Sequence, residues 1–245
     1  MKILSFNTCY GNGFSKGWWQ YLIESWRYFY AGTRNFKKIV KLVKEINPDV
    51  AALTEIEGGS YRVNFVDQVK ILAKEIGFAT TFRHAKSGPN SILKKLPIFR
   101  NLCNAILAKG KDVVCRYRYL NDGVNRLVIQ ASITPEIDLF LVHLALINRV
   151  RKRQIRELSE LIKSSSKKII LTGDFNTFGG LPELSLLARS NKLHSVNRYS
   201  QPTFPSWGPN RELDFFLISS DIKVKDFRII ESDLSDHLPI LLEIE

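Results

Sequence analysis

The feature that most constrains this chain is a short apolar run that ends in a glycine, a carboxylate and a carboxamide. Lys168 to Leu171 includes two β-branched isoleucines and predicts a short buried strand, which Gly173 breaks just before Asp174. Because side chains on an extended chain alternate, Asp174 and Asn176 should point the same way where the strand ends. Such a pair offers an oxygen to a metal ion or water and an amide to a phosphate oxygen, although Gly-Asp-x-Asn is also an ordinary turn.

Polar side chains also end several other predicted strands. These residues are Asn7, Glu55, His143, Asp214, and Asp236 with His237. A small number of carboxylate and amide oxygens suits Mg²⁺ or Mn²⁺, which usually retains waters and completes its ligand set with substrate phosphate oxygens. His237 with Asp214 as its partner is the kind of pair that orients a water molecule or a leaving group at neutral pH. A single histidine such as His143 is also compatible with a structural role.

The remaining pattern predicts an α/β protein. Helices are expected from Thr33 to Asn47, over residues 65–76 and over residues 181–191. The predicted strands are 2–6, 49–54, 78–83, 104–108, 113–119, 126–133, 137–143, 168–171, 212–218, 222–230 and 238–244. If the chain stays extended after Glu55, Glu57 would face the same side. Since many strands follow one another directly, the pattern favours a mixed-sheet α/β sandwich in one domain over residues 1–245.

Residues 14–36 form an unusual aromatic segment. Tryptophans and tyrosines are interleaved there with the cations Lys16, Arg27 and Arg34. This mixture is compatible with stacking on nucleic-acid bases, with a membrane interface and with local packing.

Two further segments are rich in cations. Residues 86–100 combine lysine and arginine with glycine and proline and predict a basic loop. Residues 149–156 include four arginines and a lysine at the start of a predicted helix, where cations oppose the helix dipole. A docked anion would explain this placement, as would a solvated basic face.

The net charge limits the binding partners to be expected, and the cysteine content limits the cellular compartment. The formal net charge is +12, which suits a polyanionic partner such as nucleic acid or an anionic membrane surface, although it also fits a merely basic protein. Three cysteines form no disulfide framework and no metal-type pair, which fits a reducing compartment. Neither a secretory signal nor a long apolar stretch is visible, so a cytoplasmic protein is expected.

Seven short blocks of the chain, taken in order, resemble the endonuclease/exonuclease/phosphatase family. The blocks are Leu4-Ser5-Phe6-Asn7, Pro48-Asp49-Val50 to Glu55, Asn104-Ala105-Ile106-Leu107, Leu141-Val142-His143-Leu144, Gly173-Asp174-Phe175-Asn176, Leu213-Asp214-Phe215-Phe216 and Ser235-Asp236-His237-Leu238-Pro239. The resemblance implies a four-layered αββα sandwich, with two mixed, mainly antiparallel sheets packed face to face and one active site at their strand ends.

The same resemblance implies a role for each matching residue. The metal ion, Mg²⁺ or Mn²⁺ in its place, would be held by Glu55 with Asn7 and Asp236. Asp174 would position or deprotonate the attacking water, Asn176 would hold a phosphate oxygen, and His143 would donate to a phosphate or leaving oxygen. His237, oriented by Asp214, would act as general base or stabilise the transition state. Asn104, in one of the matching blocks, and the cations Arg149 and Arg153 are predicted to bind substrate.

The sequence thus predicts a Mg²⁺-dependent phosphodiesterase, with nucleic acid as the leading substrate. An alternative is a phospholipid or sphingolipid phosphodiesterase, or a phosphoinositide-type phosphatase, that binds an anionic membrane surface through residues 14–36. A third hypothesis is a nucleic-acid-binding module without catalysis. Thr54-Glu55-Ile56 stands where abasic-site enzymes of the family usually have Gln-Glu-Thr, which speaks against that branch.

Overall fold

The computed structural model describes residues 1–86, 88, 96–124 and 126–245. Its strands are β1 (Lys2–Asn7), β2 (Val50–Glu57), β3 (Thr80–Ala85), β4 (Leu102–Ala108), β5 (Val114–Tyr119), β6 (Leu127–Ser132), β7 (Ile137–His143), β8 (Lys168–Asp174), β9 (Leu193–Ser195), β10 (Asp214–Ser219), β11 (Val224–Ile229) and β12 (Ile240–Ile244). Its α-helices are α1 (Trp19–Ile23), α2 (Arg34–Ile46), α3 (Gln68–Ile76), α4 (Asn148–Lys163) and α5 (Ser185–Ser190), and its 3-10 turns are η1 (Cys9–Gly11), η2 (Ser25–Tyr28), η3 (Tyr61–Val63) and η5 (Leu181–Leu184).

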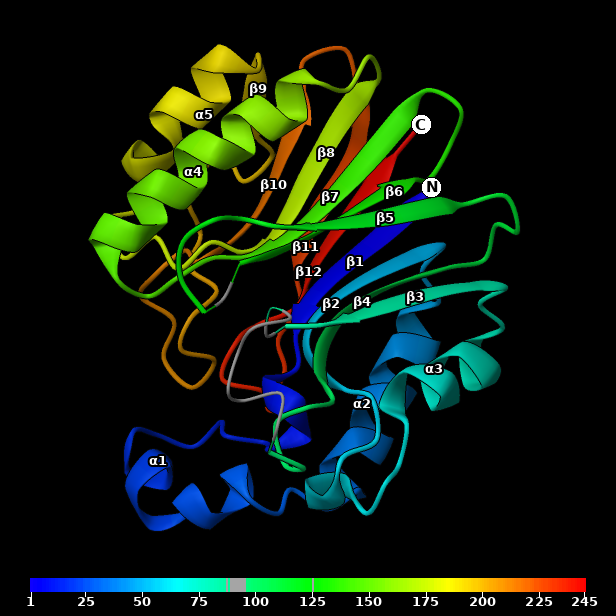
Figure 1. Cartoon of the computed structure of the whole chain (residues 1–245), viewed down its shortest axis with the longest axis vertical. Helices are drawn as coiled ribbons and strands as arrows, with labels where there is room; N and C mark the ends of the chain where they lie inside the picture. Colours follow the sequence, from blue (N-terminus) through cyan, green and yellow to red (C-terminus); the bar gives the residue numbers. More distant parts are fainter. Residues whose placement is uncertain (87, 89–95, 125) are drawn as a thin grey trace.

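Two six-stranded sheets face each other at the centre of the molecule, and helices cover their outer faces (Figure 1). The first sheet has the order β11-β12-β1-β2-β4-β3 and the second the order β5-β6-β7-β8-β10-β9. Each contains one parallel pair, β1 with β2 and β7 with β8, beside antiparallel neighbours. Two similarly built mixed sheets therefore pack face to face, as the family resemblance implies.

Three apolar clusters hold the four layers together. The cluster between the sheets includes Ile3 and Leu141, α2 and α3 pack on the first sheet through Ile39 and Leu72, and α4 packs on the second through Leu158. All five side chains are fully buried, and each such burial contributes about 1.5–3 kcal/mol. The predicted α/β sandwich is thereby confirmed.

The registers of the paired strands bring the polar strand ends together. Asn7 at the end of β1 lies opposite Thr54 of β2, directly before Glu55. In the other sheet, Asp174 of β8 lies between His143 of β7 and Asp214 of β10. Because the two sheets are stacked, both sets of side chains meet at one edge of the sandwich.

Several local predictions need correction. Gly173 does not break its strand: it lies within β8 at a φ of +127°, and a Cβ there would overlap the carbonyl oxygen of Val142. The sequence does not predict the short strand β9. The aromatic segment contains α1 and η2, for which the sequence indicates no element. Within the predicted basic loop 86–100, residues 87 and 89–95 lie outside the described residues.

Among the described residues, the structure contains no helix that is both long enough and apolar enough to cross a lipid bilayer.

Candidate active site

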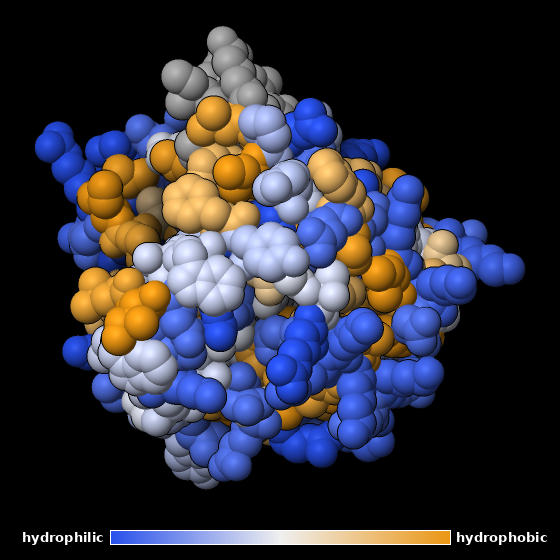
Figure 2. All heavy atoms as spheres, turned by 90° about the horizontal axis from the view of Figure 1, so that it is seen from below, coloured by the Kyte–Doolittle hydropathy of each residue, from blue (hydrophilic) through white to orange (hydrophobic). Residues whose placement is uncertain are grey.

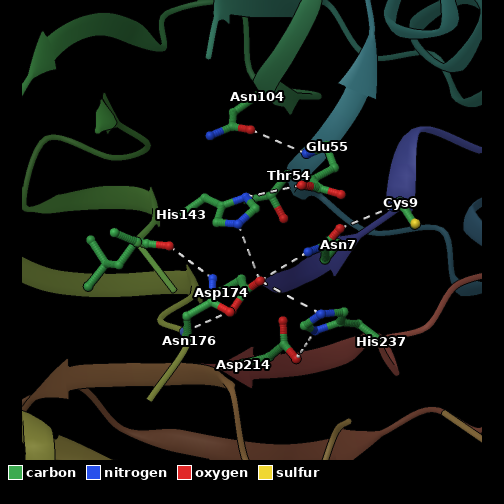
Figure 3. Close-up of polar contacts among 12 residues, drawn as sticks. Asn7, Cys9, Thr54, Glu55, Asn104, His143, Asp174, Asn176, Asp214 and His237 are labelled. Carbon is green, nitrogen blue, oxygen red and sulfur yellow. Dashed lines mark hydrogen bonds and ion pairs between the residues drawn. The ribbon is translucent and has the colours of Figure 1, made fainter. Parts of the chain in front are cut away.

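The buried carboxylate of Asp174 lies at the centre of the site (Figure 3). Its Oδ2 accepts a hydrogen bond from Asn7 Nδ2 at 3.1 Å and lies 3.5 Å from His143 Nε2 and 3.7 Å from His237 Nε2. Its Oδ1 accepts the backbone N–H of Asn176 at 2.9 Å. Residues from both sheets therefore converge on one carboxylate, and Asn7 lies 167 positions from it in the sequence.

His237 and Asp214 form the second part of the site. His237 Nδ1 lies 2.8 Å from Asp214 Oδ2, and both side chains are buried. The same oxygen accepts the hydroxyl hydrogen of Thr203 at 2.7 Å. The carboxylate is thus fixed on one side by Thr203 and orients the imidazole on the other, as the sequence predicts for this pair.

Glu55 reaches the site because β2 is bulged at this point. The register of β2 against β4 shifts between Leu53 and Ile56, and Glu55 has a left-handed φ of 54°. Such a bulge changes the direction of a side chain at a strand end. Glu55 Oε1 lies 2.6 Å from the ammonium nitrogen of Lys86, which also donates to the Tyr10 hydroxyl at 2.8 Å.

Asn104 supports Glu55 from the neighbouring strand β4. Its Oδ1 accepts the backbone N–H of Glu55 at 3.2 Å, while its buried Nδ2 has no hydrogen-bond partner among the described residues. Asn104 therefore holds the bulge that presents Glu55, and direct contact with a substrate stays a prediction.

Glu57 does not join Glu55 in the site. Because the chain is not extended at Glu55, Glu57 turns into the protein, where its Oε1 lies 3.0 Å from Arg62 Nη1 and accepts from the Ser60 hydroxyl. Arg62 is itself buried and donates to the carbonyl oxygen of Arg27. The pair of Arg62 and Glu57 therefore anchors the backbone of the aromatic segment at Arg27.

A cavity of about 340 Å³ opens above these residues. Its polar floor, called here the pocket floor, consists of Asn7, Glu55, His143, Asp174, Asn176, Asp236 and His237. Its aromatic rim consists of Trp18, Tyr21, Tyr28, Phe178 and Phe204. Floor and rim are joined directly, since the Tyr21 hydroxyl donates to Asp236 Oδ2 at 2.5 Å. The aromatic segment thus forms one wall of the site.

The buried titratable groups have strongly shifted pKa values. Burial, together with the ammonium of Lys86, lowers the pKa of His143 to about 3, so this imidazole is neutral at ordinary pH. Burial disfavours the imidazolium of His237, but the carboxylates of Asp214 and Asp174 outweigh it and raise the pKa of His237 well above its usual value. Burial also raises the pKa of Asp174, against the opposing effect of His237.

The other predicted site residues lie in different surroundings. Asn176 is at the floor and donates from Nδ2 to the carbonyl oxygen of Leu144 at 2.9 Å.

Arg149 and Arg153 do not line the cavity, and Arg153 pairs with Asp122 at 2.7 Å. An anion does lie against the first turns of α4, but it belongs to the protein itself. Buried Arg151 forms an ion pair with the carboxylate of Glu183 at 2.8 Å.

Sequence reasoning misses several residues of the site. Lys86 stands at the edge of a predicted basic loop, Tyr21 in the aromatic segment and Thr203 in a proline-rich loop. Their types are visible in the sequence, but the contacts with Glu55, Asp236 and Asp214 depend on loops that return to the site from distant parts of the chain. No pattern along the chain indicates such a return.

The sequence and the fold match those of a known protein family. The profile of the Endonuclease/Exonuclease/phosphatase family matches residues 4–237. The chain belongs to this family. It is accordingly an enzyme that hydrolyses phosphoester bonds. No match was found among curated proteins.

Solved structures of this family share the fold. A conserved protein of unknown function from Enterococcus faecalis V583 has a TM-score of 0.70 at 16% identity, covering 100% of this chain and 99% of that chain. The mannosyl-6-phosphatase Bt3783 of Bacteroides thetaiotaomicron VPI-5482 has a TM-score of 0.68 at 13% identity over 100% and 99%. A humanized D. rerio TDP2 has a TM-score of 0.67 at 15% identity over 100% and 98%. At these identities the likeness shows the fold alone.

Enzymes of this family generally depend on a divalent metal ion, and the residues present fit one. The carboxylates of Glu55 and Asp236 and the amide of Asn7 line one cavity, which is the oxygen-rich donor set of a hard cation. Burial and the nearby Asp236 raise the pKa of the Cys9 thiol. Asp174, Asp214 and His237 also offer ligand atoms within 4.8 Å of one another. Within this trio, Asp214 Oδ2 already contacts His237 Nδ1.

Proposed function

We propose that this chain is a Mg²⁺-dependent phosphodiesterase that cuts nucleic acid. The observation that carries the proposal is the cavity in which Asp174, His143 and His237 lie beneath an aromatic rim. Flat aromatic side chains stack on any base, so the rim fits a nucleotide beside a scissile phosphate. The net charge of +12 favours association with a polyanion.

The protonation states suggest how the proton handling is divided. Asp174, whose pKa burial raises, is suited to accept a proton from the attacking water. His237, whose pKa Asp214 and Asp174 raise, is suited to remain an imidazolium and stabilise charge on a phosphoryl oxygen. Neutral His143 would donate an N–H hydrogen bond to a phosphate or leaving oxygen.

Glu55, Asn7 and Asp236 would hold the metal ion. When bound, Mg²⁺ would offset negative charge on the phosphoryl oxygens. The chain's own residues keep that side of the cavity in place: Asn104 fixes the backbone of Glu55, and Tyr21 and Ser235 donate to the two oxygens of Asp236.

The test is incubation of the purified protein with supercoiled plasmid and with single-stranded DNA, in Mg²⁺ or in chelator. We expect cleavage that requires the metal and that the His237→Ala variant lacks. The control is His194→Ala, which alters an exposed histidine on β9. Cleavage by this variant at the rate of the unchanged protein would exclude a general effect of losing a histidine. If neither DNA is cut under any condition, the proposal is wrong for DNA.

A second candidate is hydrolysis of a phosphodiester in a phospholipid or sphingolipid. The observation that favours it is the exposure of aliphatic residues beside the rim, where Leu22 is 82% and Ile23 is 71% exposed. Stacking on bases does not use such side chains. Metal-dependent release of water-soluble phosphate ester from sphingomyelin or phosphatidylglycerol vesicles, without DNA cleavage, would support this candidate over the first.

A further inference from the structure

An exposed apolar surface adjoins the aromatic rim. It consists of Trp19, Leu22, Ile23, Trp26 and Phe29, each about half to four-fifths exposed, and we call it the α1–η2 surface. Figure 2 shows hydrophobic and near-neutral residues gathered in the middle and on the left of the face seen from below, on the side where Figure 1 places α1. Contiguous apolar patches of this kind usually mark an interaction site.

A basic pocket lies next to this surface. Its cavity of about 400 Å³ is lined by Lys16, Arg27, Arg34 and Lys38, with Trp26 shared between the pocket and the α1–η2 surface. Lys16, Arg34 and Lys38 form no ion pair with any residue that the structure describes, and Asp233 is the acidic residue in the lining. The pocket therefore carries an excess of positive charge that the protein does not neutralise.

The start of α2 adds to this positive potential. The first turn of α2 contains no acidic residue, and the side chain of Thr33 does not cap it. The N-terminal end of a helix presents unpaired N–H groups and favours an anion. Arg34 and Lys38 lie on the first turns of the same helix, so dipole and side chains act in the same direction.

The α1–η2 surface is held in a defined place. Gln20 accepts the backbone N–H groups of Ser15 and Lys16 at 2.8 and 2.7 Å and donates to Glu24 at 2.9 Å. Glu24 in turn pairs with Arg27 at 3.2 Å, and Arg27 donates to a carbonyl oxygen of the preceding loop. The exposed apolar side chains are therefore presented outward by an internally bonded scaffold.

We propose that the α1–η2 surface and the basic pocket together bind the surface of an anionic phospholipid bilayer. The apolar side chains enter the interfacial region, and the basic pocket receives a lipid phosphate, which is the combination that interfacial helices use. Trp18, whose ring contacts Tyr21, continues this surface into the aromatic rim, so a docked molecule turns its cavity toward the bilayer. This inference goes beyond the proposed nuclease activity, because vesicle binding needs neither the metal ion nor His237.

A nucleic acid fits this surface less well. Its phosphates would suit Lys16, Arg34 and Lys38, and its bases would stack on Trp19 or Trp26. However, the aliphatic side chains of Leu22 and Ile23, which are the most exposed members of the surface, would gain nothing from either contact.

The first experiment is co-sedimentation of the full chain with vesicles of phosphatidylglycerol and phosphatidylcholine, in chelator. We expect the affinity for vesicles to fall at least about tenfold for Leu22→Ser/Ile23→Ser. The variant lacks two aliphatic side chains that are largely exposed in the free protein and would be buried in the bilayer. Leu186→Ser/Val224→Ser, which alters exposed apolar residues on α5 and β11, is the matched control and should bind as the unchanged protein does.

A second pair of variants tests the role of charge, and both the variant and its control alter residues of helix α2. Arg34→Glu/Lys38→Glu should weaken vesicle binding roughly tenfold more than Lys41→Glu/Lys44→Glu, which alters the net charge equally but lies outside the pocket. Vesicles of phosphatidylcholine alone should bind weakly. Equal losses in the two charge variants would mean that net charge and not the basic pocket is responsible, and would overturn that part of the proposal.

Tryptophan fluorescence supplies the deciding readout. The chain has four tryptophans, Trp18, Trp19, Trp26 and Trp207, and the last lies 5.3 Å from Trp18, so emission reports on this region alone. We expect a blue shift with anionic vesicles and none with inorganic phosphate or glycerol phosphate. A shift with single-stranded DNA but not with vesicles, or vesicle binding unchanged in Leu22→Ser/Ile23→Ser, would show the proposal to be wrong. Because His237→Ala should bind vesicles normally, failure of docking and failure of catalysis are distinguishable.

Discussion

The pocket floor consists of buried and half-buried polar side chains at strand ends and in the adjoining loops, whereas the α1–η2 surface beside the aromatic rim consists of exposed side chains on short helical turns. The floor takes its geometry from the register of two sheets, so each polar side chain has a defined neighbour. The rim takes its geometry from side-chain contacts, such as Tyr21 to Asp236 and Arg62 to Arg27. The proposed chemistry thus lies on residues that strand pairing places, and the proposed partner contact on residues that side-chain contacts place.

The largest effect should come from the floor. His237→Ala removes the imidazolium that lies between Asp214 and Asp174, and we expect kcat on the substrate that proves active to fall about 10²–10⁴-fold. Circular dichroism should stay unchanged, because the strands beneath keep their pairing. His194→Ala serves as control, and a loss of the same size there would contradict the assignment.

A large effect on stability should come from the anchor of the rim. Arg62→Met leaves Glu57 as an unpaired buried carboxylate, so we expect the free energy of unfolding to fall by about 3–5 kcal/mol. Urea unfolding measures it, with Arg153→Ala, which breaks the exposed pair with Asp122, as a control that costs about 0–1 kcal/mol. The double variant Arg62→Met/Glu57→Met should recover part of the loss, and no recovery would mean that the pair matters for reasons other than burial of charge.

A change of pH dependence should separate orientation from chemistry. Asp214→Asn removes the carboxylate that raises the pKa of His237, so His237 loses its proton at lower pH. If the imidazolium is the active form, the alkaline side of the kcat profile moves to lower pH and kcat falls on the order of 10²-fold, with a smaller change in KM. Asp138→Asn, at a buried carboxylate on β7 that Ser132 and Gln130 hold, should leave the profile in place. If the acid side of the profile moves to lower pH instead and the alkaline side stays in place, His237 acts as the base.

The smallest effect should come from the contact between rim and floor. Tyr21→Phe removes one hydrogen bond to the carboxylate of Asp236, which we expect to lower activity roughly tenfold at limiting Mg²⁺ and less at saturating Mg²⁺. Tyr28→Phe, at a neighbouring tyrosine of the rim, is the matched control. An equal loss in both variants at all metal concentrations would mean that Tyr21 acts by packing and not through Asp236.

The strand-end residues show how far local pattern reaches. A strand has a period of two and a buried strand is apolar, so a polar residue after such a run is conspicuous in the sequence. For this reason the sequence alone indicates most of the polar residues that the fold brings together, namely Asn7, Glu55, His143, Asp174, Asp214 and His237. The alternation of strands and helices indicates the sandwich in the same way.

Other features follow only from the tertiary structure. The bulge at Glu55 sends Glu57 into the protein, which no spacing along the chain indicates, since the shift depends on pairing with β4. Lys86 reaches Glu55, and Tyr21 reaches Asp236 across 215 positions, because loops return to the strand ends. Local patterns encode which elements form and which side chains they carry, whereas contacts between distant loops depend on the packing of the whole chain.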